Sequence, residues 1–95
     1  APPAHYLLQI CGDSMINAGI FDGDLIAVHS TREVRQGQIA IVRIEDEVTV
    51  KRWNRINDRR VDLIAENDAY APIEIDLSEQ SIAIEGVSVG VIRRQ

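Results

Sequence analysis

One serine and one lysine have side-chain types that can perform nucleophilic chemistry together. Ser14 lies in segment 12–15, whose Gly-Asp-Ser-Met sequence indicates a turn that presents a hydroxyl group. Lys51 lies in segment 47–52, which has the pattern of a strand. A serine hydroxyl is a poor nucleophile at neutral pH, so a neighbouring group must take its proton. A lysine can do this when burial keeps its amine neutral.

Each of these residues also has an ordinary structural interpretation. Ser14 can simply belong to a capped turn, which is the usual role of such a sequence between a strand and a helical turn. Lys51 can be an exposed strand residue that discourages edge-to-edge pairing. Catalysis requires a tight turn whose backbone N–H groups face an oxyanion, and a lysine turned inward with a lowered pKa. From the residues alone, both interpretations stay open.

Composition limits the kind of protein that positions this pair. The 95 residues suffice for one domain, and 45% of them are hydrophobic, mainly Ile, Val, Ala and Leu. A net charge of −5 argues against a domain whose main partner is a phosphate backbone. Cys11 is the single cysteine, and no apolar run approaches the roughly 18 residues of a membrane span. We therefore expect a soluble, cytoplasmic protein that does not interact with a membrane.

Short apolar segments separated by turns predict an all-β, compact domain of short, mostly antiparallel strands. At most one short helical turn is expected, after Ser14, with Asp13 or Ser14 as its N-cap. Segments 38–44 and 47–53 should form a hairpin, and the second of them carries Glu47, Thr49, Lys51 and Trp53 on one face. The other expected strands are 5–11, 25–28, 61–65, 73–77, 81–85 and 87–92, the last two being separate or one strand broken near Gly86.

Several motifs, in one order along nearly the whole chain, resemble a known family. They lie in segments 12–15, 20–29, 37–43, 47–52 and 84–92. Together they resemble the C-terminal domain of the LexA repressor family, which has a LexA/signal-peptidase-like fold. The resemblance implies a self-cleaving peptidase domain with a serine–lysine dyad, attached to a DNA-binding domain. It implies no metal and no organic cofactor.

The resemblance also implies roles for individual residues. Ser14 would be the nucleophile, Lys51 the neutral general base, and the backbone amides of Asp13 and Ser14 the oxyanion donors. Glu47 occupies a position near the lysine without a catalytic role. The family's dimers pair their C-terminal strands across a two-fold axis, and the corresponding residues here are Val89, Val91, Ile92 and Arg93.

Two segments of the family have no counterpart among these residues. One is the helix-turn-helix that binds operator DNA, and the other is the self-cleavage loop with its Ala-Gly bond. Only thirteen residues precede Ser14, so we expect residues 1–95 to be a single peptidase and dimerisation domain without either segment. Ala18-Gly19 lies directly after the serine and is interpreted as a plain turn. Operator DNA would be contacted only through the missing domain.

The implied function is repression in the bacterial DNA-damage (SOS) response, which ends when a RecA filament on single-stranded DNA stimulates self-cleavage. Two alternatives share the fold. One is a UmuD-like subunit of a translesion DNA polymerase, which is an interaction module, and the other is a phage-type repressor of the same peptidase class. The basic run at 51–60, with Trp53 within it, indicates a solvated hairpin rather than a nucleic-acid surface.

Two metal-site patterns are rejected. Cys11 with His5 and His29 lacks the spacing of metal ligands, and Cys11 is expected to be a free, buried cysteine. A calcium loop that begins at Asp22 is excluded, because Ala27 stands where such a loop needs glycine.

Overall fold

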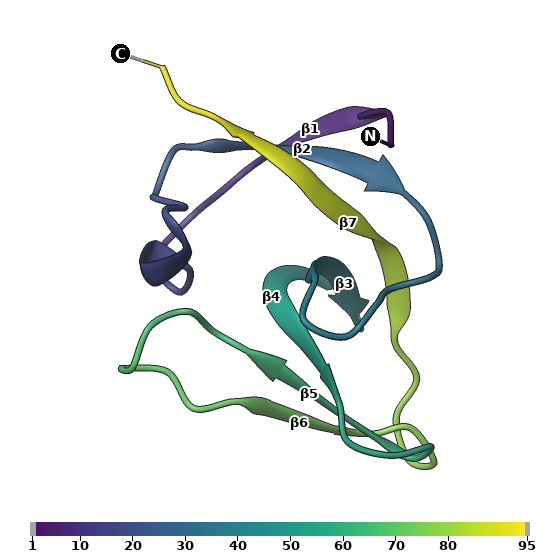
Figure 1. The fold of residues 1–95 in the computed structure, drawn as a ribbon. Helices are drawn as coiled ribbons and strands as arrows, with labels where there is room; N and C mark the ends of the chain where they lie inside the picture. The colour runs from purple at the N-terminus through teal and green to yellow at the C-terminus, as the bar shows by residue number, and fades with distance from the viewer. Residues whose placement is uncertain (1, 95) are drawn as a thin grey trace.

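The computed structural model describes residues 2–94, which contain seven β-strands and one short 3-10 turn. The elements are β1 (Tyr6–Gln9), η1 (Ile16–Ala18), β2 (Leu25–Ser30), β3 (Ile39–Ile44), β4 (Glu47–Arg55), β5 (Arg60–Ile64), β6 (Ile73–Asp76) and β7 (Ala83–Ile92). The strands form one curled antiparallel sheet in the order β1-β2-β7-β3-β4-β5-β6 (Figure 1). The predicted all-β fold, with a single helical turn after Ser14, is confirmed.

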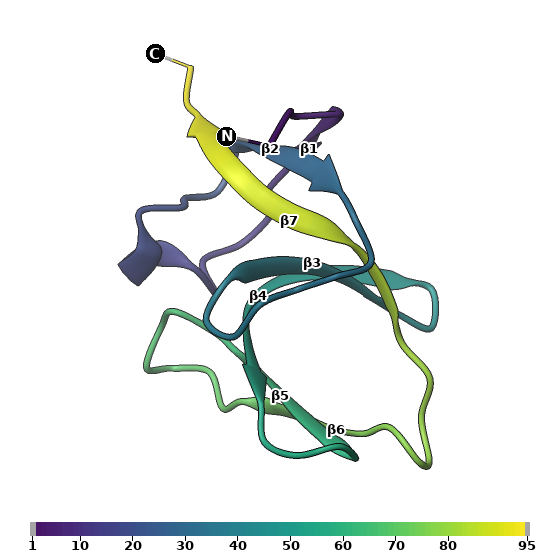
Figure 2. The same cartoon turned by 45° about the vertical axis from the view of Figure 1, so that its right-hand side comes forward.

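β7 joins the two halves of the sheet. Residues 83–87 pair with β3, residues 86–92 pair with β2, and the register shifts once on each side, so the strand bends as it crosses (Figure 2). The predicted break near Gly86 is therefore a bend in one continuous strand. A Cβ at Gly86 would lie 2.4 Å from the carbonyl oxygen of His29 and 2.7 Å from Val28 Cγ1. Only glycine allows this close approach of the two strands.

The curled sheet encloses two clusters of buried apolar side chains. One contains Met15, Ile20, Ile26, Val28, Ile41 and Val50, and the other contains Ala40, Val42, Trp53, Val61, Leu63 and Ile75. β4 supplies both clusters, because alternate residues of a strand face opposite sides. Lys51 follows Val50 on this strand and pairs in register with Ala40, which is fully buried. Because both Val50 and Ala40 are buried, Lys51 lies inside the protein and is itself buried.

One local expectation, the residue that caps the helical turn, is wrong. Met15, not Asp13 or Ser14, precedes η1 at the N-cap, and no side chain caps this turn. The Asp13 carboxylate and the Ser14 hydroxyl instead make long-range hydrogen bonds, to Tyr70 and Lys51. Within residues 2–94, no helix is long and apolar enough to cross a membrane.

Candidate active site

The loop between β1 and η1 carries Ser14, and local contacts fix its course. Gly12 has a φ of 92°, in the left-handed region that favours glycine. Its N–H donates a hydrogen bond of 2.7 Å to Asp22 Oδ1, so this aspartate holds the turn. Met15, directly after Ser14, is 2% exposed and packs into the first core cluster. The serine is thus fixed between a tight turn and a buried anchor.

The segment after β5 holds this loop from the other side. Asn67 Nδ2 donates a 2.9 Å hydrogen bond to the Asp13 carbonyl oxygen, and the Tyr70 hydroxyl donates one to the Asp13 carboxylate. In Figure 1 the two segments lie beside each other at one end of the sheet. Within residues 2–94, neither the Asp13 nor the Ser14 backbone N–H donates a hydrogen bond. Both amides therefore remain available for an anion, as the prediction of oxyanion donors requires.

Lys51 reaches Ser14 from β4. Its Nζ lies 3.2 Å from Ser14 Oγ, 2.6 Å from Thr49 Oγ1 and 3.2 Å from the Val50 carbonyl oxygen. An ammonium donates to all three oxygens. A neutral amine has two N–H groups and one lone pair, so it can donate to Thr49 and Val50 and accept the hydroxyl proton of Ser14. The site accommodates both protonation states without rearrangement.

Burial shifts the protonation equilibrium of Lys51 toward the neutral amine. The side chain is only 9% exposed, and loss of water lowers its pKa from the ordinary value of 10.5. None of the three groups that Nζ contacts is a carboxylate. Glu47, expected near the lysine, is exposed at the start of β4. The ammonium is therefore desolvated without a compensating negative charge, which favours the neutral amine.

A cavity of about 210 Å³ lies against the pair. Its walls are residues 8–11 at the end of β1, the loop with Ser14 and Met15, and residues 48–51 of β4. The volume is below the roughly 300–1,000 Å³ of sites for drug-sized ligands, so it suits one or two residues of a polypeptide. Cys11 lines this cavity and is exposed. The expectation of a buried cysteine is wrong, because the chain leaves the sheet after Gln9 and Cys11 lies at the cavity wall.

The other candidate residues lie in structural contacts. His5 and His29 stack with their ring centroids 4.8 Å apart. Within the part of the chain that the structure describes, no group of three or more His, Cys, Asp or Glu is arranged to hold a metal ion. In the basic run, three arginines are ion-paired: Arg52 with Glu66, Arg59 with Asp76, and Arg60 with Asp62 and Glu74.

Sequence reasoning missed three residues that support the site. Thr49 contacts the lysine amine, and strand periodicity did place the two side chains on one face. Asn67 and Tyr70 hold Asp13 from 54 and 57 residues away along the chain. Nothing local in the sequence connects segments so distant.

Residues 1–89, nearly the whole chain, match the family described as Peptidase S24-like. The chain belongs to this family. It is 61% identical over 93 residues to the LexA repressor of Ectopseudomonas mendocina, with 98% of this chain and 45% of that protein covered. The LexA repressor of Marinobacter nauticus is 57% identical over 94 residues, with 99% and 46% covered. That of Vibrio cholerae serotype O1 is 56% identical over 92 residues, with 97% and 44% covered.

The chain therefore spans less than half the length of these curated relatives. The resemblance to the LexA family, inferred from the motifs, is confirmed, and the domain is a peptidase domain of the LexA repressor type. The catalytic roles of Ser14 and Lys51 stay a prediction, and the contact between their side chains supports it.

Proposed function

We propose that this domain cleaves a segment of its own repressor, with Ser14 as nucleophile and Lys51 as neutral general base. The observation that carries the proposal is the 3.2 Å contact between Lys51 Nζ and Ser14 Oγ, made by a lysine that is 9% exposed. A base of this kind must be within hydrogen-bond reach of the proton that it takes, and its pKa must approach the working pH. The contact meets the first condition, and burial lowers the pKa of Lys51, as the second condition requires.

The chemistry follows from these positions. Lys51 accepts the hydroxyl proton as Ser14 Oγ attacks the scissile carbonyl carbon, and the Asp13 and Ser14 amides bind the oxyanion. The resulting ammonium gives its proton to the leaving amine, which leaves an acyl-enzyme. Lys51 then deprotonates a water molecule that hydrolyses the ester and restores the serine. Thr49 and the Val50 carbonyl accept hydrogen bonds from the amine and keep its lone pair directed at the serine.

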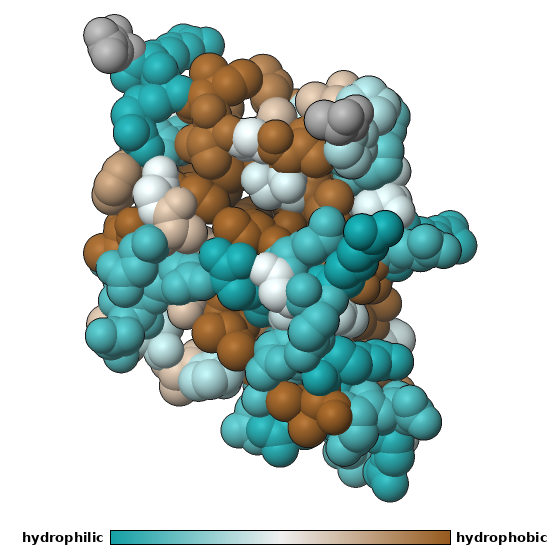
Figure 3. Space-filling view, viewed as in Figure 1, coloured by the Kyte–Doolittle hydropathy of each residue, from teal (hydrophilic) through white to brown (hydrophobic). Residues whose placement is uncertain are grey.

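We also propose that the domain forms a homodimer through β7. β2 pairs with one edge of residues 86–92, and β3 pairs with the other edge of β7 only at residues 83–87. Within residues 2–94, no strand therefore pairs with the edge of residues 88–92 that faces away from β2. Val89, Val91 and Ile92 are between 37% and 46% exposed. Figure 3 shows apolar side chains gathered over the part of the molecule where β1 and β7 lie. Two copies can pair these open edges antiparallel about a two-fold axis.

Arg93 plays a different part within one copy. Its guanidinium binds the buried Asp24 through two hydrogen bonds of 2.8 Å and lies 4.6 Å above the ring of Phe21. These contacts fix the end of β7 against the segment before β2. We propose that Arg93 supports the dimer by holding β7 in place, and its direct participation in the interface remains a prediction.

The names of the relatives suggest the wider context. We propose that the domain belongs to a cytoplasmic repressor of the SOS response, in which a separate domain binds operator DNA. A RecA filament on single-stranded DNA would stimulate cleavage, and separation of the two parts would weaken dimeric DNA binding and release repair genes.

Cleavage in trans tests the dyad. The domain is mixed with a separate fragment that carries an Ala-Gly cleavage loop, and the rate is followed from roughly pH 7 to pH 11. We expect a rate that rises about tenfold per pH unit below the pKa of Lys51, and that is lost in Ser14→Ala and Lys51→Ala but kept in the exposed control Ser81→Ala. Wild-type cleavage by a folded Lys51→Ala variant would refute the base. No cleavage at any pH by the folded wild-type dimer would favour a UmuD-like interaction module.

A further inference from the structure

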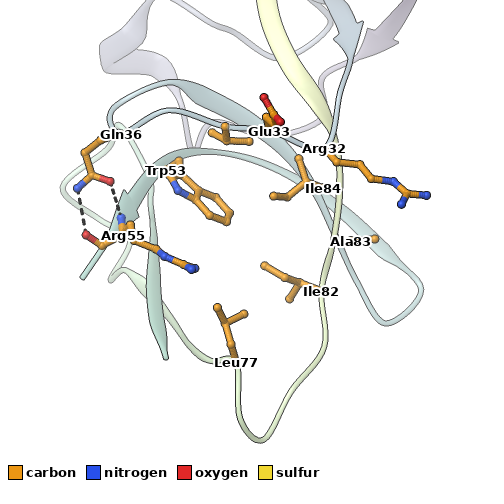
Figure 4. Close-up of a pocket in the computed structure, with 10 residues that line it drawn as sticks. Arg32, Glu33, Gln36, Trp53, Arg55, Leu77, Ile82, Ala83 and Ile84 are labelled. Atoms are coloured by element: carbon orange, nitrogen blue, oxygen red, sulfur yellow. Dashed lines mark hydrogen bonds between the residues drawn. The ribbon is translucent and has the colours of Figure 1, made fainter. Parts of the chain in front are cut away.

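A second and larger hollow lies further along β4, at Trp53 and Arg55. Its volume is about 810 Å³, within the range of sites that bind ligands. Its large apolar lining residues are Val34, Trp53, Leu77, Ile82 and Ile84. Figure 4 labels four of them, and their side chains point toward one another across the open space: Trp53, Leu77, Ile82 and Ile84. Neither Ser14 nor Lys51 lines this hollow, so nothing in the proposed cleavage chemistry uses it.

One cation extends into this apolar space. The Arg55 side chain reaches toward the hollow from β4, whereas Arg32 and Glu33 at the rim point outward (Figure 4). Gln36 fixes the Arg55 backbone, since its Oε1 accepts the Arg55 N–H at 2.7 Å and its Nε2 donates to the Arg55 carbonyl at 3.2 Å. Its neighbours Arg52, Arg59 and Arg60 all have carboxylate partners. Within residues 2–94, the Arg55 guanidinium forms no ion pair.

The wall that contains Ile82 can accept an extended chain. Residues 81–82 precede β7 and lie outside any strand. Within the described residues, their backbone N–H and C=O groups make no hydrogen bond with another backbone group. Unpaired groups of this kind can bind a polypeptide by strand addition. A peptide therefore fits this wall better than a small apolar molecule does.

We propose that this hollow docks an extended segment of a partner protein in which a bulky apolar residue lies next to an aspartate or glutamate. The apolar side chain fills the space beside Trp53 and Ile82, and the carboxylate pairs with Arg55. Charge adds selectivity, because a net charge of −5 otherwise disfavours the approach of acidic segments. The unpaired Arg55 makes this apolar site an exception.

Trp53 is the only tryptophan, so its fluorescence reports occupancy directly. The dimeric domain is titrated with a blocked peptide, acetyl-Gly-Glu-Leu-Phe-Asp-Gly-amide, and with two variants that replace the acidic residues by lysine or the apolar residues by alanine. We expect saturable binding of the first peptide alone. Arg55→Gln should weaken it by about tenfold or more, the effect of losing a charged hydrogen bond, while Arg94→Gln leaves it unchanged.

Variants and competitors distinguish peptide docking from self-association and from nucleic-acid binding. Because Gln36 contacts Arg55 only through its backbone, Arg55→Gln should fold normally, and Ser14→Ala should bind the peptide as wild type does. Equal binding of the lysine peptide, or unchanged affinity in Arg55→Gln, would overturn the proposal. So would an emission change with protein concentration alone, at concentrations above those at which the proposed β7 dimer forms, since it indicates a second copy in the hollow. The same change with single-stranded oligothymidine would overturn it as well.

Discussion

Replacement of Thr49 by valine separates the orientation of Lys51 from its protonation. Thr49 Oγ1 lies 2.6 Å from Lys51 Nζ, nearer than the other two contacts of the amine. Valine keeps the β-branched shape that suits a strand and removes the hydroxyl acceptor. The hydroxyl stabilises an ammonium more than an amine, because hydrogen bonds of charged groups are stronger.

The magnitude follows from this difference. Hydrogen bonds to charged groups contribute about 1.5–3 kcal/mol and neutral ones about 0.5–1.5 kcal/mol, so Thr49 favours the ammonium by about 1 kcal/mol. Thr49→Val should therefore lower the pKa of Lys51 further and move the midpoint of the pH–rate profile down by about 0.7 pH unit. The rate at high pH should fall by about tenfold to a hundredfold, because the amine loses one of the contacts that direct its lone pair.

The assay is single-turnover cleavage in trans across the pH range. Thr31→Val is the matched control, since Thr31 is the only other threonine and its hydroxyl accepts the Glu33 N–H at 3.1 Å, outside the cleavage cavity. Urea unfolding of both variants checks that the fold is intact. A midpoint that stays fixed or moves upward, with a wild-type rate at high pH, would refute the role given to Thr49.

Three further predictions concern stability and assembly. Lys51→Met should raise the free energy of unfolding near pH 7, because it removes a buried, desolvated ammonium. Urea titrations should show this gain shrinking as pH rises from the lowered folded-state pKa of Lys51 toward 10.5. In that range the unfolded wild-type protein binds more protons than the folded one, so the wild type gains stability as pH rises. Gly86→Ala should lower stability by about 1–3 kcal/mol in thermal unfolding, because its Cβ would lie 2.4 Å from a carbonyl oxygen of β2. Gly90→Ala is the control and should be near neutral, because its Cβ would have its nearest contact at 3.9 Å, with Ala27 Cβ. Val91→Lys should dissociate the proposed dimer in sedimentation experiments, whereas Ile56→Lys, at a similarly exposed apolar residue, should not.

Much of the fold was predictable because its signals are local. Alternating residues and polar turns predict the short strands, and the period of two places Thr49 and Lys51 on one face of β4. The Gly-Asp-Ser sequence predicts the turn that presents Ser14. The family resemblance then assigns roles to the serine and the lysine, and the structure brings their side chains together.

The remaining features depend on how distant segments meet. Lys51 is buried because β4 lies between two core clusters, and periodicity alone does not show which face of a strand is covered. The contacts of Asp13 with Asn67 and Tyr70 come from the curl of the sheet. The continuity of β7 through Gly86 likewise depends on the close approach of β2, which no local pattern records.

The protonation of Lys51 is the most direct test of the dyad. Lys51 is the only lysine in the sequence, so lysine labelled with ¹³C at the ε carbon gives one signal that NMR can follow through a pH titration. A neutral general base predicts a pKa below the ordinary value of 10.5 in the folded domain, and a return toward that value in concentrated urea. A folded-state pKa at or above 10.5 would contradict the assignment of Lys51 as the base that activates Ser14.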